Sequence, residues 1–209
     1  MKSRALKPVV FLLCLLPLQW FTWQLFTDRL GANPIDEIAD ASGEWTLRLL
    51  LIVLAMTPMK RLLGWSWPIR IRRMLGLFAF FYACIHLMIY LWLDQFFDWQ
   101  EILLDILDRP FITVGMLAFA LSIPLAVTSN RMMVKRLGKS WKKLHRLAYL
   151  LPALGVVHYW WLVKADVFEP LVYGLVLLAL LAFRLPLGRS GVPMKSPVSG
   201  SADRNRVQC

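Results

Sequence analysis

The sequence is poor in cysteine, histidine and acidic residues, and these shortages narrow what the chain can be. Its three cysteines, Cys14, Cys84 and Cys209, form no CxxC motif and no paired spacing, so we expect neither a disulfide framework nor a zinc site. No GxGxxG motif follows an expected strand, which excludes a nucleotide-binding domain of that type. No carboxylate lies near the middle of an apolar stretch, where ion-coupled carriers usually need one.

Long apolar stretches are abundant instead. The 209-residue chain is 58% hydrophobic, with a mean hydropathy of +0.57. Runs of about 20 apolar residues are typical of transmembrane helices. The sequence therefore predicts an all-α integral membrane protein, a six-helix transmembrane bundle formed by residues 9–185. The six expected spans are 9–27, 44–59, 74–93, 111–129, 145–163 and 168–185.

The segments around these spans are expected to be short. The N-terminal run has a basic start but no small-residue cleavage site, so we expect a retained helix and not a signal peptide. Residues 186–209 form a basic Ser/Gly/Pro-rich tail, which we expect to be disordered. The acidic loop before residue 111 is expected to carry a surface helix, with Ile102, Leu103, Ile106 and Leu107 on one face. No internal repeat is evident.

The charges divide between the two sides of this expected bundle. Segments 1–8, 60–73, 130–146 and 184–209 hold 20 of the 24 Lys and Arg residues, whereas 12 of the 13 acidic residues lie on the other side. Cytoplasmic loops of membrane proteins retain Lys and Arg, so both termini are expected in the cytoplasm of a bacterial inner-membrane protein. The net charge of +11 is therefore a topology signal, and no nucleic-acid partner is expected.

Two of the three histidines are expected at one depth in the bilayer. His86 follows the start of its span by twelve residues and His158 by thirteen, so both lie roughly 18–20 Å from the inner boundary. Two imidazoles at equal depth on two helices are suited to bind the two axial positions of a haem b iron. The alternative is that each histidine bonds a neighbouring carbonyl and only holds helices together.

The third histidine, His145, is expected at the inner boundary. A second haem there would need a partner on the third span, but Arg72 and Arg73 occupy those positions and cannot bind iron. His145 is therefore either a ligand or supporting group of an inner redox site, or an interfacial anchor. The arginine pair is either topogenic charge or a site for haem propionates, flavin phosphate or quinone oxygens.

Several motifs resemble those of a known family. One histidine on the third span and two on the fifth resemble the ferric-reductase-type transmembrane domain. More closely, the chain is similar to the MsrQ family, the haem-binding membrane subunits of the periplasmic protein-methionine-sulfoxide reductase system. The matching stretches are GANP, TPMKR, RIRRMLGL, CIHLMIY, RPFITVG, LAVTS, LGKSWKKLHRLAYL and VVHYWWLVK, between Gly31 and Lys164.

This resemblance implies a function and its cofactors. It implies a haem b protein that passes electrons to a periplasmic molybdenum-containing methionine sulfoxide reductase, for the repair of oxidised envelope proteins. It also implies FMN, with the quinone pool or a cytoplasmic flavin reductase as electron source. His86, His145 and His158 occupy the family's histidine positions. The alternatives are a ferric-reductase-type cytochrome with another acceptor, or a non-redox membrane anchor or transporter.

Overall fold

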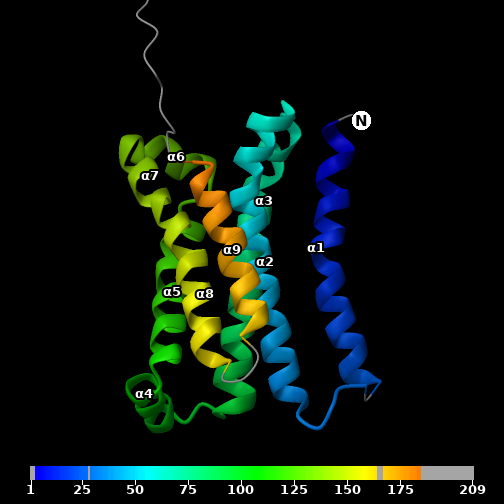
Figure 1. Ribbon diagram of the computed structural model, residues 1–209, viewed down its shortest axis with the longest axis vertical. Coiled ribbons are helices and arrows are strands. Elements are labelled where there is room, and N and C mark those ends of the chain that lie inside the picture. The colour runs from blue at the N-terminus through cyan, green and yellow to red at the C-terminus, as the bar shows by residue number, and fades with distance from the viewer. Residues whose placement is uncertain (1–2, 28, 164–166, 185–209) are drawn as a thin grey trace, which may run out of the picture.

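The computed structural model describes residues 3–27, 29–163 and 167–184, and every regular element in these ranges is helical. The all-α prediction is therefore confirmed for this part of the chain. The long helices run side by side in a bundle, with α1 on one side of it (Figure 1). The helices are α1 (Ser3–Phe26), α2 (Pro34–Leu63), α3 (Trp67–Met88) with the π-helix η1 (Ile89–Asp94), α4 (Trp99–Asp108), α5 (Pro110–Val127), α6 (Arg131–Leu137), α7 (Lys139–Leu144), the 3-10 helix η2 (His145–Tyr149), α8 (Leu150–Leu162) and α9 (Phe168–Ala182).

Three stretches in the described residues are long and apolar enough to cross a membrane: Leu6–Phe26, Trp67–Asp94 and Pro110–Val127. The fourth apolar helix, α9, is shorter, and the expected fifth span is divided between η2 and α8. The six-span topology thus stays a prediction, although six long helical stretches lie where the sequence predicts them. The tail 186–209 lies outside the described residues.

Two helices begin earlier than the sequence analysis expected. α2 starts at Pro34, ten residues before the predicted span, because proline suits the first helical turn and Asp36 and Glu37 favour its positive end. α3 starts at Trp67 and carries Pro68 in its first turn. Arg72 and Arg73 consequently lie within α3 and not before it.

The expected short helix exists as α4. Asp98 caps it, accepting hydrogen bonds from the backbone N–H groups of Gln100 and Glu101. Ile102 is buried against the bundle, whereas Leu103 and Leu107 are exposed. The four residues lie at helical spacing on α4 and share a face as predicted, and the Ile102 edge of this face packs towards the bundle together with the buried Asp105.

α1 is attached to the bundle through a buried tyrosine of α3. Proline lacks an N–H group, so Pro17 interrupts the hydrogen bonding of α1. Tyr82 supplies hydrogen-bond partners to this turn of α1. Its hydroxyl donates to the Cys14 carbonyl at 2.7 Å and accepts from the Leu18 N–H at 3.2 Å. Backbone groups in a bilayer need such partners because no water is available there.

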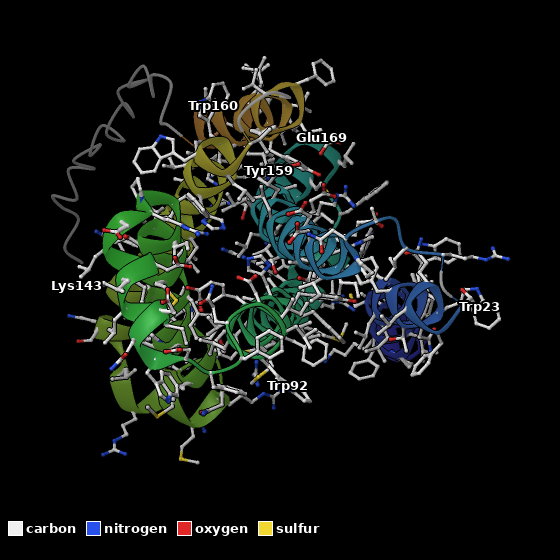
Figure 2. All side chains as sticks on the ribbon, turned by 90° about the horizontal axis from the view of Figure 1, so that it is seen from below. Trp23, Trp92, Lys143, Tyr159, Trp160 and Glu169 are labelled. Carbon is white, nitrogen blue, oxygen red and sulfur yellow. The ribbon has the colours of Figure 1, made fainter. Side chains whose placement is uncertain are left out.

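The bundle has one acidic end and one basic end. The described chain starts and stops at the end that carries α6 and α7, and α4 marks the opposite end (Figure 1). Figure 2 shows the bundle from the α4 end, with Trp23, Trp92 and Trp160 at its periphery and Tyr159 beside Glu169. Tryptophans around one end of a bundle are typical of a membrane–water interface.

Candidate functional site

A large cavity runs along the bundle between α2, α3, α5 and α8. Its volume is about 1130 Å³, at the upper limit of ordinary small-molecule sites. All five residues singled out in the sequence line it: His86, His158, His145, Arg72 and Arg73. The structure therefore brings together residues that are up to 86 positions apart in the chain.

His86 and His158 face one another across this cavity. Their ring centres are 6.1 Å apart and their planes are nearly perpendicular, at 86°. An imidazole nitrogen binds a metal at about 2 Å and its ring centre lies about 1 Å further away, so two imidazoles on opposite sides of one iron have centres about 6 Å apart. The observed separation fits a bis-histidine iron site.

The hydrogen bonds of the two rings determine which nitrogen is available. His86 Nδ1 lies 2.9 Å from the Ala39 carbonyl oxygen, and His158 Nδ1 lies 2.6 Å from that of Phe111. Because a carbonyl oxygen only accepts, each Nδ1 must carry the proton and donate it. Each neutral ring then keeps its lone pair on Nε2, the state an axial ligand needs. A histidine can therefore hold two helices together through Nδ1–H and still bind iron through Nε2.

Each histidine ring lies against a glycine of the neighbouring helix. A Cβ atom on Gly43 would come within 3.1 Å of the His86 ring, and one on Gly115 within 2.9 Å of the His158 ring. Both distances are shorter than an ordinary van der Waals contact. The sequence did not single out these glycines, although each stands four residues after the residue whose carbonyl binds the same histidine.

The surroundings of His86 and of His158 follow the same arrangement. The histidine follows its carbonyl partner by 47 residues in both cases. Two equivalent hairpins are therefore present, one formed by α2 and α3 and the other by α5 and α8. Each hairpin starts at the acidic end of the bundle and returns to it, as in a parallel internal repeat. The repeat was not evident in the sequence because few residues besides the glycine and the histidine are identical at this spacing.

His145 is bound differently, at the basic end of the cavity. Its Nε2 lies 3.1 Å from the hydroxyl oxygen of Thr128, whose own proton is donated to the Pro124 carbonyl at 2.6 Å. The hydroxyl oxygen therefore accepts from His145, so the neutral ring carries its proton on Nε2 and its lone pair on Nδ1. His145 also stacks on Trp141 at 4.0 Å. Its tautomer is the opposite of that in the facing pair.

The 3-10 helix explains how His145 and His158 reach one cavity. On an ideal α-helix, thirteen residues would leave the two side chains splayed by roughly 140°. Residues His145–Tyr149 instead form a 3-10 turn before α8 begins at Leu150. The change of pitch rotates His145 relative to α8, and the two histidines then line the same cavity at depths roughly 20 Å apart.

The charge that lines the cavity changes sign along its length. Asp36, Asp40, Glu44 and Asp94 line the end near α4, together with Arg109, which is paired with Asp105. Arg72, Arg73, Lys142 and Arg146 line the other end. Partial desolvation, and then the charge of Asp36, raise the pKa of the Asp40 carboxyl. An anionic ligand is therefore favoured at the basic end and disfavoured at the acidic end.

A polar network closes the acidic end beside His158. The Tyr159 hydroxyl lies 2.7 Å from Glu169 and 3.3 Å from Glu44, and Glu44 pairs with Arg48. Arg48 in turn donates to the Tyr173 hydroxyl at 2.8 Å. These contacts connect α2, α8 and α9 next to His158.

Comparison with known proteins agrees with this architecture. The model of the family described as "Ferric reductase like transmembrane component" matches residues 42–156, more than half of the chain, which include both Gly43 and His145. The chain therefore belongs to this class of membrane proteins. No solved structure matches it.

Relatives that match over most of their length indicate which family within this class the chain belongs to. The chain is 52% identical over 183 residues to the "Protein-methionine-sulfoxide reductase heme-binding subunit MsrQ" of Herminiimonas arsenicoxydans, covering 86% of this chain and 84% of the relative. It is 54% identical over 185 residues to the protein of the same name from Rhodospirillum rubrum, covering 88% and 89%. The chain belongs to the MsrQ family.

Proposed function

We propose that the chain is the haem b subunit that carries electrons across the bacterial inner membrane to a periplasmic molybdenum-containing methionine sulfoxide reductase. The observation that carries this proposal is the facing pair His86 and His158, each with Nδ1–H held by a carbonyl and Nε2 directed by that bond to bind iron. The names of its relatives supply the partner system. The bound haem would supply one-electron transfer.

The residues around the two histidines orient the rings, raise their basicity and leave space for them. The carbonyls of Ala39 and Phe111 orient the two rings and raise their basicity, while Gly43 and Gly115 leave room for them. The facing pair lies towards the acidic end, which the charge distribution assigns to the periplasmic side. A donor at this depth keeps the tunnelling distance to an external partner short.

We propose the basic end as the place of electron entry. Arg72 and Arg73 line the cavity there together with His145, and arginine binds phosphate and carboxylate oxygens through two parallel hydrogen bonds. FMN or a membrane quinone is the proposed ligand at this end, with the quinol pool or a cytoplasmic flavin reductase as electron source.

The purified protein tests this proposal directly. It should be red, with a Soret band that shifts and sharpens on reduction, and its haem should be reduced by quinol or reduced flavin. The reduced haem should be reoxidised by the methionine sulfoxide reductase together with a sulfoxide-containing peptide. A colourless protein would contradict the haem assignment.

The family match also favours a second acceptor, ferric iron. The two functions are distinguished by comparing the rates at which ferric citrate and the reductase–peptide mixture reoxidise the haem. Rapid reoxidation by iron alone would favour the ferric reductase activity.

The proposed direction of transfer depends on topology. A reporter fused after Arg206 should be cytoplasmic, and one inserted at Asp40 should be periplasmic, because Lys and Arg accumulate on the first side. An external reporter at the C-terminus would reverse the proposed direction.

A further inference from the structure

Arg184, at the end of α9, is a partly buried cation whose hydrogen bonding is incomplete. One terminal nitrogen donates to the Tyr149 hydroxyl at 2.5 Å, and the other donates to the Leu54 carbonyl at 2.7 Å. The guanidinium also lies 4.7 Å from the centre of the Tyr149 ring. Its Nε is buried and has no hydrogen-bond partner among the residues that the structure describes.

The groups around Arg184 do not neutralise it. Arg61 and Arg72 lie within electrostatic range and add like charge. Arg61 also reaches the Phe183 carbonyl at 3.5 Å, next to Arg184 itself. Both ion pairs formed within the described ranges, Arg48–Glu44 and Arg109–Asp105, lie at the acidic end of the bundle. Three arginines thus gather without a described counter-charge, an arrangement that costs free energy unless an anion binds.

The surface beside these arginines is apolar. Leu62 and Leu63, which follow Arg61 in the last turn of α2, are 66% and 53% exposed, and Phe183 is 55% exposed. A ligand that satisfies both the cations and this surface has an anionic head and hydrocarbon chains. A free phosphate ion would satisfy only the arginines.

We propose that Arg61, Arg72 and Arg184 form a binding site for the phosphate of an anionic phospholipid. Basic groups between transmembrane helices on the cytoplasmic side recognise such headgroups. Arginine is well suited because its planar fork donates two parallel hydrogen bonds to phosphate oxygens. The acyl chains lie against Leu62, Leu63 and Phe183.

This site is separate from the facing histidines. Arg72 also lines the basic end of the central cavity, whereas neither Arg61 nor Arg184 is among the described residues that line it. Variants of Arg61 and Arg184 therefore test lipid binding separately from the proposed electron entry, in which Arg72 takes part. Lipid retention reports on this site and haem reduction by quinol or reduced flavin reports on the proposed electron entry, so failure of one is distinguishable from failure of the other.

The test is native mass spectrometry of the purified holoprotein with added phosphatidylglycerol, compared with phosphatidylcholine and with inorganic phosphate at equal concentration. The variants are Arg61→Gln and Arg184→Gln. The control is Arg136→Gln, which removes an exposed charge from α6 at the same end of the bundle. Haem content is measured in every sample.

Wild type and Arg136→Gln should retain phosphatidylglycerol, whereas Arg61→Gln and Arg184→Gln should each bind it about tenfold more weakly, because each loses a charge-assisted hydrogen bond. Arg61→Gln leaves the buried guanidinium of Arg184 intact and keeps the test valid if Arg184→Gln does not fold.

Equal retention of phosphatidylcholine, or unchanged binding in both variants, would overturn the proposal. Binding of inorganic phosphate as tight as that of the lipid would overturn the lipid assignment. Loss of haem from Arg184→Gln with unchanged lipid binding would show that Arg184 stabilises the bundle and does not bind the lipid, and would also overturn the proposal.

Discussion

The hairpin of α2 and α3 and the hairpin of α5 and α8 agree at the acidic end of the cavity and differ at the basic end. At the acidic end, each supplies a carbonyl, a glycine and a histidine in the same relation. At the basic end, thirteen residues before each histidine, the first hairpin has Arg73 and the second has His145. A short turn joins α2 to α3, whereas α6 and α7 join α5 to η2.

This difference indicates two kinds of site in one cavity. A symmetric pair of neutral imidazoles suits a metal bound from both sides. An arginine opposite a histidine of the other tautomer suits a ligand that brings its own anionic group. The symmetric end is therefore the proposed place of the haem, and the asymmetric end the proposed place of electron entry.

The largest effect is expected from removing a member of the symmetric pair. His86→Ala and His158→Ala should each weaken haem binding by more than about a hundredfold, because loss of a ligand exceeds loss of its supporting group. Haem per protein, measured as the pyridine haemochrome, checks this. Wild-type haem content and spectra in both variants would rule out the pairing.

The glycines allow a finer test of the same symmetry. Gly115→Ala should weaken haem binding about tenfold, and Gly43→Ala somewhat less, because the added Cβ comes closer to His158 than to His86. Gly174→Ala is the control, since its Cβ would make only an ordinary contact at 3.6 Å with Val156. Equal haem binding by all three variants would contradict a matched role for the two glycines.

His145→Ala tests the asymmetric end. The variant should keep at least half of the wild-type haem, because the facing pair remains intact. Haem reduction by quinol or reduced flavin should be slower than in wild type, whereas direct reduction by dithionite should be unchanged. Stopped-flow absorbance at the Soret band measures both rates. Haem loss as severe as in His158→Ala would make His145 a primary ligand.

The smallest effect on haem is expected from Tyr82, which belongs to the first hairpin alone and has Leu154 as its counterpart in the second. Tyr82→Phe removes both hydrogen bonds to α1 and should lower the free energy of unfolding by about 1–3 kcal/mol, with haem content unchanged. Thermal unfolding in detergent, followed by far-UV circular dichroism, measures the change in stability, and the Soret band measures the haem content. Leu154→Ala provides a comparison in which α1 stays attached.

Much of the architecture followed from patterns within the chain. Apolar length predicted the long helices, and the asymmetry of Lys and Arg predicted one basic and one acidic end, which the structure shows. Helix starts were predicted less well because Pro34 and Pro68 extend helices into segments that hydropathy alone assigns to loops. The role of Gly43 and Gly115 was invisible because a glycine in a helix carries no sign of what lies against it.

The sequence by itself determined which residues stand at which depth, since helical rise converts spacing along the chain directly into distance across a bilayer. It therefore indicated that His86 and His158 share a level that His145 does not. Only the tertiary structure decided which way each ring turns and which nitrogen keeps its lone pair. Those properties depend on carbonyls 47 residues away and on the change of pitch at His145, and neither is encoded in local spacing.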